Sequence, residues 1–147
     1  MVRAIDTVTQ ILQQHVPISI QFHRLKLEQE KKEWEDCSRL VGEVKKDFIN
    51  IVERELRKRL NENPILTKSM YLDIMPIPSA VIEEHIRTSG QISISSSKVP
   101  VLQELVDFVK KEGLNPFISH EDSETPGKKY DAVFQVIIPD EIIQKTF

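Results

Sequence analysis

Apolar residues follow a helical spacing over the first part of the chain. They predict a short helix over residues 3–15, with one face formed by Ile5, Val8 and Leu12. Pro17 lacks a backbone N–H, and we expect it to mark a turn. A second, longer helix is predicted from residue 19 to residue 60, because nothing in this stretch breaks a helix except Gly42. Two helices joined at Pro17 predict a helical hairpin.

The long helix carries the most informative pattern in the sequence. Six apolar residues are spaced 3, 4, 3, 4 and 3, a heptad pattern typical of coiled coils: Trp34, Cys37, Val41, Val44, Phe48 and Ile51. We call this set the Trp34–Ile51 stripe. The helix would span roughly 60 Å, whereas a domain formed by the rest of the chain has a radius of gyration of about 12 Å. The stripe is therefore expected to bind a protein partner or a second copy, with packing inside the chain as the alternative.

After residue 64 the pattern changes from helical spacing to alternation. Alternating apolar and polar residues predict four strands, at residues 70–75, 91–96, 116–120 and 130–138. Helices are expected at residues 79–88, with Ser79 as N-cap, and from Ser97 to Gly113, with a short helix near residues 139–144. The resulting order is β-α-β-α-β-β.

This order predicts a helical arm over residues 1–63 and a small α/β domain over residues 64–147. The fold class is α+β or α/β, with a mixed sheet and helices on one face. The strand at residues 130–138 is apolar on both faces, so it should be central, and it should form a hairpin with the strand before it. The first two connections are long enough for parallel crossovers.

Charge and cysteine content narrow the functional classes. The net charge is −3, whereas general nucleic-acid binders usually carry a concentrated basic surface. The outward positions of the first two strands also do not form the aromatic motif with which open sheets stack RNA bases: Tyr71, Asp73, Ser93 and Ser95. One basic cluster leaves a local nucleic-acid contact as an alternative: Arg54, Arg57, Lys58 and Arg59.

The single cysteine, Cys37, indicates a reducing, cytoplasmic compartment. We recognise no signal peptide and no apolar run of the ~20 residues that a membrane span needs. Cys37 lies on an apolar stripe, where a buried structural cysteine is expected rather than a nucleophile.

Two further segments contain polar residues that bind ligands in other proteins. A turn before a helix could hold a phosphate on its backbone N–H groups, although it lacks glycines and helix capping also explains it: Ser95, Ser96, Ser97 and Lys98. A loop with nearby acidic residues resembles a metal site, but its spacing fits a solvated hairpin tip better: His120, Glu121, Asp122, Glu124 and Asp131. We therefore expect no metal and no cofactor.

These observations favour a non-enzymatic structural, assembly or adaptor subunit that binds protein, or itself, through residues 19–60. Such a subunit could belong to a large complex, including a viral or scaffold particle. The first alternative is a nucleic-acid or nucleoprotein accessory factor that uses Arg54–Arg59. The second is a small enzyme with a phosphate- or metal-binding loop.

Overall fold

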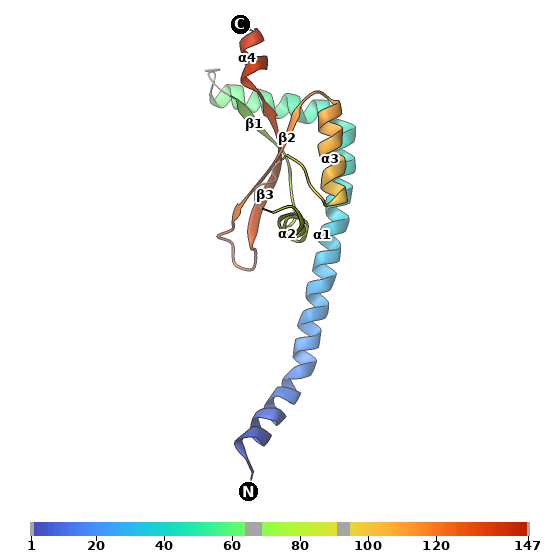
Figure 1. The fold of residues 1–147 in the computed structure, drawn as a ribbon, viewed down its shortest axis with the longest axis vertical. Coiled ribbons are helices and arrows are strands. Elements are labelled where there is room, and N and C mark those ends of the chain that lie inside the picture. Colours follow the sequence, from blue (N-terminus) through green and yellow to red (C-terminus); the bar gives the residue numbers. More distant parts are fainter. Residues whose placement is uncertain (1, 64–68, 91–94, 147) are drawn as a thin grey trace. The chain divides into compact units, whose positions relative to one another are not determined.

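The computed structural model describes residues 2–63, 69–90 and 95–146. The contacts within the chain divide it into an N-terminal unit, Met1–Lys32, and a C-terminal unit, Glu33–Phe147. Helix α1 (Ala4–Glu62) contributes to both units (Figure 1). The C-terminal unit also contains β1 (Met70–Pro76), α2 (Ser79–Ser89), α3 (Pro100–Lys111), β2 (Asn115–Asp122), β3 (Tyr130–Ile138) and α4 (Asp140–Thr146).

Helix α1 runs without a turn through Pro17, so the predicted helical hairpin is wrong. A proline inside a helix removes one hydrogen bond and tends to bend the backbone. The neighbouring residues are exposed, which allows water to hydrate the carbonyl that loses its partner. The helix also passes Gly42 and ends close to the predicted stop.

The irregular residue of α1 is Asp47, five positions after Gly42. Its backbone angles are φ −116° and ψ 19°, which are not helical. The Asn50 side-chain amide donates a hydrogen bond of 2.7 Å to the Asp47 carboxylate. This side-chain contact joins the irregular residue to the turn that follows it. The irregularity at Asp47 bends α1 inside the C-terminal unit.

The sheet has three strands in the order β1-β3-β2, and both pairings are antiparallel. The predictions that residues 130–138 form the central strand and pair with the preceding strand are confirmed. Thr125 and Lys128 close the connecting turn, in which Gly127 has a φ of +80°. The described sheet is antiparallel rather than mixed. The strand predicted at 91–96 falls largely on residues 91–94, which lie outside the described residues, and residues 95 and 96 are not in a strand.

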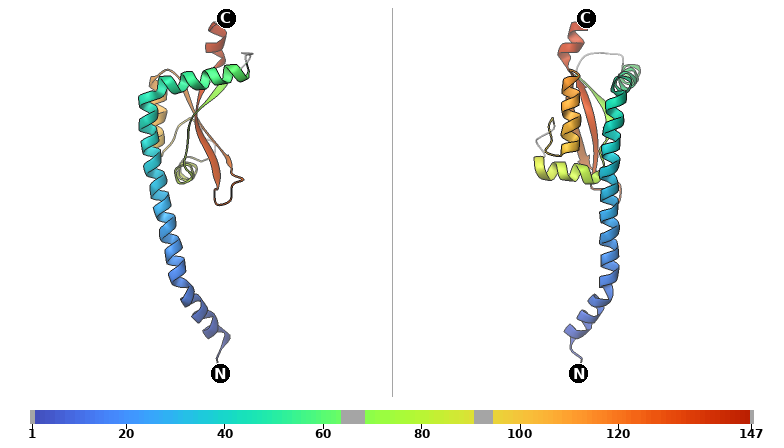
Figure 2. Two further views of the ribbon diagram at one scale, coloured as in Figure 1. Left: turned by 180° about the vertical axis from the view of Figure 1, so that it is seen from behind. Right: turned by 90° about the vertical axis from the view of Figure 1, so that its right-hand side faces the viewer.

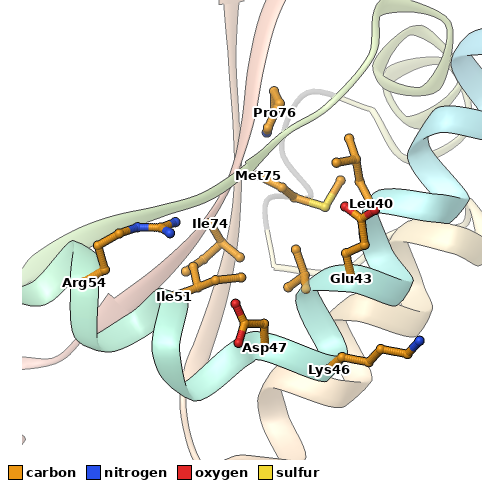
Figure 3. A pocket seen from close by; sticks show the side chains of 10 residues that line it. Leu40, Glu43, Lys46, Asp47, Ile51, Arg54, Ile74, Met75 and Pro76 are labelled. Carbon is orange, nitrogen blue, oxygen red and sulfur yellow. The ribbon is translucent and has the colours of Figure 1, made fainter.

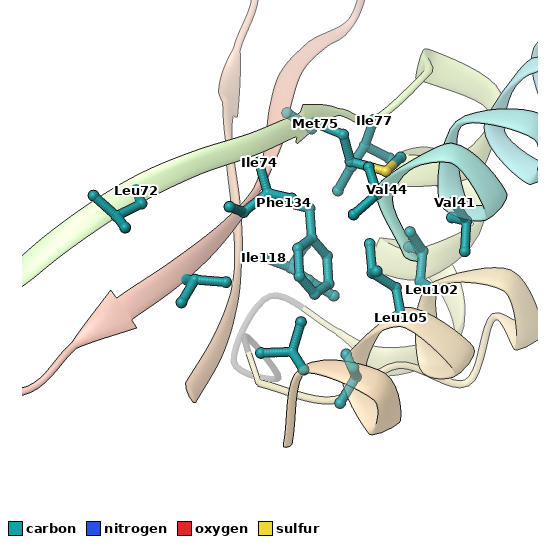
Figure 4. Close-up of a cluster of buried hydrophobic side chains, with 14 of the residues drawn as sticks. Val41, Val44, Leu72, Ile74, Met75, Ile77, Leu102, Leu105, Ile118 and Phe134 are labelled. Atoms are coloured by element: carbon teal, nitrogen blue, oxygen red, sulfur yellow. The ribbon is translucent and has the colours of Figure 1, made fainter. Parts of the chain in front are cut away.

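The hydrophobic core lies between the helices and one face of the sheet. Leu72, Ile118 and Phe134 from the three strands belong to the same buried cluster as Val44 of α1 and Leu105 of α3 (Figure 4). The alternate residues of β3 on the other face are only half-buried. Figures 1 and 2 show α3 and the part of α1 just before its bend side by side on one side of the sheet. The mixed helix-and-strand class with helices on one face is confirmed.

The N-termini of α2 and α3 differ from the predictions. Neither Ser79 nor Ser97 is the N-cap, because the capping positions are Pro78 and Val99. The first turn of α2 is instead capped from a distance, since the Ala80 N–H donates to the Glu33 carboxylate at 3.2 Å. This contact joins the start of α2 to α1, and a carboxylate is favoured at a helix N-terminus.

Candidate functional site

The Trp34–Ile51 stripe packs inside its own chain. Its last five members are buried in the core of the C-terminal unit, and Trp34 packs against that core while half-buried. The Phe48 ring meets the Phe108 ring of α3 edge-on, with 5.3 Å between centroids. Lys45 and Glu104 form an ion pair of 2.8 Å beside these rings. These side chains therefore pack inside the chain, as the alternative interpretation of the stripe expected.

Cys37 is fully buried in this core. Burial disfavours the thiolate and raises the pKa of the Cys37 thiol to about 11. A nucleophilic cysteine needs the opposite shift, so the thiol acts here as a small apolar core group.

The exposed apolar residues are concentrated in the N-terminal unit. Among the described residues, fourteen large apolar side chains are exposed, and eleven of these lie before residue 33: Val2, Ile5, Val8, Ile11, Leu12, Val16, Ile18, Ile20, Phe22, Leu25 and Leu27. Phe22 keeps 69% of its surface exposed and Leu12 keeps 61%. Isolated exposed apolar residues are ordinary, but a contiguous set on one element marks an interaction surface.

Part of this set follows a second heptad pattern that the sequence analysis did not follow. Seven positions are spaced 4, 3, 4, 3, 4 and 3, and we call them the N-terminal stripe: Ala4, Val8, Ile11, His15, Ile18, Phe22 and Leu25. The pattern crosses Pro17, where the sequence predicted a turn. The signal is present in the sequence, and it becomes readable once residues 4–25 are known to form one helix.

Most of the N-terminal stripe lies in an uncharged part of the chain. Residues 7–23 contain no Asp, Glu, Lys or Arg, and the polar positions are occupied mainly by Gln, Thr, Ser and His. The following residues, 24–36, are rich in both charge signs. The stripe therefore presents apolar side chains with uncharged polar flanks, which suits a dry helix–helix contact.

The basic cluster at the end of α1 is largely paired with carboxylates. Arg57 contacts Glu53 at 3.0 Å, Arg54 contacts Glu55 at 3.6 Å, and Arg59 lies 4.0 Å from Asp73. These ion pairs lower the positive potential that a phosphate backbone would meet. The fourth member, Lys58, is exposed.

The turn Ser95–Lys98 uses its backbone donors internally. The Ser97 N–H donates to the side-chain oxygen of Gln103 at 2.8 Å, and the Lys98 N–H donates to the Ser89 hydroxyl at 3.1 Å. The Val99 N–H donates to the Ser97 hydroxyl at 3.1 Å. The N–H groups that would bind a phosphate thus already have acceptors within the chain.

The acidic loop is held by its own neighbours. Asp131 forms an ion pair of 2.8 Å with Lys128, and this hydrogen-bonded ammonium group lowers the pKa of the Asp131 carboxyl. The His120 ring packs edge-on against Tyr130. Across residues 2–63, 69–90 and 95–146, no group of three or more His, Cys, Asp or Glu side chains is arranged to hold a metal ion.

A hollow of about 460 Å³ lies where α1 bends beside β1 (Figure 3). Its base is apolar, with Leu40, Ile74 and Met75, and charged residues such as Glu43 and Arg54 stand around it. The register of β1 against β3 shifts between Asp73 and Met75. None of the described residues that line the hollow is a serine, cysteine or histidine.

The open face of the sheet contains an aromatic pair that the sequence analysis missed. Tyr71 of β1 and Phe117 of β2 meet edge-on across β3, with 5.1 Å between ring centroids. The Gln135 amide donates to the Asp73 carboxylate at 2.6 Å on the same face. Tyr71 pairs with Ile137 of β3, and Phe117 pairs with Gln135.

The N-terminal stripe is therefore an apolar surface that the described residues of its own unit leave uncovered. In the part of the chain that the structure describes, no helix is long and apolar enough to cross a membrane. Comparison of the chain with protein-family models, with curated proteins and with solved structures gives no match.

Proposed function

We propose that this chain is a non-enzymatic assembly or adaptor subunit that binds protein through the N-terminal unit. The observation that carries the proposal is the row of exposed apolar side chains along the N-terminal stripe: Val8, Ile11, Ile18, Phe22 and Leu25. Soluble monomers rarely expose contiguous apolar surface of this extent, and such surfaces usually serve association. The sequence placed the binding surface at Trp34–Ile51; the proposal moves it to residues 4–25.

The other functional classes have weaker support. A nucleic-acid contact at Arg54–Arg59 would have to displace three ion pairs with carboxylates. A phosphate at Ser95–Lys98 would have to displace acceptors from three backbone N–H groups. The proposed role needs neither change, because the apolar side chains of the N-terminal unit are already exposed.

Two matched variants of the full chain test the proposal. Ile18 lies on the N-terminal stripe, whereas Ile20 lies about 200° further round the helix. Their exposed fractions are similar, 47% and 55%. We would express tagged wild type, Ile18→Glu and Ile20→Glu in the native cell and measure the native mass of each. Wild type and Ile20→Glu should migrate in a particle larger than the 17.0 kDa chain, and Ile18→Glu should not. The same native mass for all three proteins would contradict the proposal.

A further inference from the structure

We infer that the partner of the N-terminal stripe is the same stripe in further copies of this chain, joined in a bundle of three or four helices. This inference rests on the proposed function and adds the identity and number of the partners. It follows from the period of the stripe, its width, its flanking residues and its area.

The period favours a helix as the partner. Spacings of 4 and 3 are the repeat of helices that pack along one another in a coiled coil. Residues 4–25 continue this period for three heptads, over roughly 33 Å of helix. A flat or globular partner surface would not require an unbroken heptad. A helix with the same repeat would, and a second copy supplies one.

The residues within the heptad favour more than two helices. Ile11 and Ile18 occupy the d positions, where β-branched residues disfavour a parallel two-stranded coiled coil and favour three or four strands. Ile5 and Leu12 occupy the adjacent e positions and widen the apolar face beyond a two-residue seam. A face of this width is typical of helices in bundles. His15 places one polar ring at an a position, the kind of position that sets the register of neighbouring helices.

The charge pattern allows copies to meet. Residues 7–23 carry no Asp, Glu, Lys or Arg, so identical helices bring no like charges together along this stretch. The same feature argues against a lipid surface as the partner. Helices that lie on membranes usually carry many Lys and Arg residues on their polar face, and here that face is built from Gln and Thr.

The area is sufficient for a stable contact. A standard interface buries roughly 800 Å² on each partner. The apolar face of residues 5–25 offers an area of that order, because its large members keep about half or more of their surface exposed: Ile5, Val8, Ile11, Leu12, Ile18, Phe22 and Leu25. This face would become buried in a bundle of copies.

The experiment is the solution mass of the purified full chain, measured by light scattering over a dilution series. Wild type should have three or four times the mass of the 17.0 kDa chain. Ile18→Glu should fall to the mass of one chain, and Ile20→Glu should keep the wild-type mass. Far-UV circular dichroism of all three proteins would show that Ile18→Glu remains folded. If that variant unfolds, Ile18→Ala is the second variant, because it keeps the helix and removes apolar area. The oligomer of Ile18→Ala should dissociate at a higher protein concentration than the wild-type oligomer.

Other outcomes would overturn the inference in different ways. A wild-type dimer would overturn the bundle of three or four. A wild-type monomer would overturn self-association, while the proposed function would stand if the native particle still depended on Ile18. A wild-type monomer, together with a native particle that does not depend on Ile18, would overturn both the inference and the proposed function. A monomer that co-sediments with phosphatidylcholine vesicles through Ile18 would make the partner a lipid surface.

Discussion

The imidazole Nδ1 of His85 lies 2.7 Å from the hydroxyl oxygen of Ser97, and both side chains are buried. His85 belongs to α2, whereas Ser97 lies in the segment that leads into α3. The same hydroxyl oxygen accepts a hydrogen bond from the Val99 N–H. One side chain thus connects α2 to the start of α3, and it satisfies polar groups that have no access to water.

Replacing Ser97 by Ala should lower the free energy of unfolding by about 1–3 kcal/mol, because it leaves buried polar partners without their hydrogen bond. Chemical denaturation followed by circular dichroism measures this change. Ser95 is exposed, and Ser95→Ala is the matched control, expected within about 0.5 kcal/mol of wild type. Equal stabilities for the two variants would contradict a structural role for the Ser97 hydroxyl.

Truncating two phenylalanines of α1 should affect two different properties, the stability of the fold for Phe48 and association for Phe22. Phe48 is 4% exposed and contacts Phe108, so Phe48→Ala should cost about 3–5 kcal/mol of unfolding free energy. Phe22 is 69% exposed, and Phe22→Ala should leave the stability of the C-terminal unit unchanged. It should instead weaken association through the N-terminal stripe. A large loss of stability in the Phe22 variant would show that Phe22 packs inside the chain.

The Cys37 thiol should resist labelling by a thiol reagent at neutral pH until the protein is unfolded. Its pKa of about 11 exceeds the ordinary value of 9.0, so the folded state holds the proton more tightly than the unfolded state. The resulting stabilisation is fully present below pH 9.0 and is lost as the pH rises toward about 11. Unfolding free energies measured from pH 8 upward should therefore fall more steeply for wild type than for Cys37→Ala. Equal slopes would mean that the thiol ionises as easily when folded.

Pro17→Ala should strengthen the helix of the N-terminal unit. Proline in a helix interior costs about 3 kcal/mol relative to alanine, and alanine restores the missing N–H. Hydrogen exchange should show slower exchange of the backbone amides on both sides of residue 17. Pro78→Ala, at the N-cap of α2, is the control and should leave these amides unaffected. Unchanged exchange in Pro17→Ala would imply that residue 17 does not limit this helix.

The sequence predicted the elements of the C-terminal unit better than the surface they leave exposed. Alternation identified β1, and the apolar character of residues 130–138 on both faces identified β3 and placed it correctly in the centre. Gly90 and Gly113 follow α2 and α3 with positive φ, as their role as helix terminators requires. These features depend on local period and backbone freedom, which a sequence displays directly.

The missed features depend on neighbours that are distant in sequence. The cap of α2 comes from Glu33, 47 residues before Ala80, and no local pattern shows such a pairing. The Trp34–Ile51 stripe looked too long for one domain because a straight helix was assumed, whereas α1 bends at Asp47. Pro17 was predicted to mark a turn, so the heptad pattern that crosses it was not recognised. In each case tertiary contacts or water offset a local preference.

The central position of β3 has a consequence for the order in which the protein forms. Both β1 and β2 bond to β3, which is the last of the three strands to be synthesised. The sheet therefore cannot close until the ribosome has released residues as far as Ile138. Until then the apolar side chains of α1 from Cys37 to Ile51 lack the strands that cover them, while residues 4–25 have long been free to meet other chains. If the N-terminal stripes associate as inferred, nascent chains on one polysome would meet through residues 4–25 before any of them has a finished core.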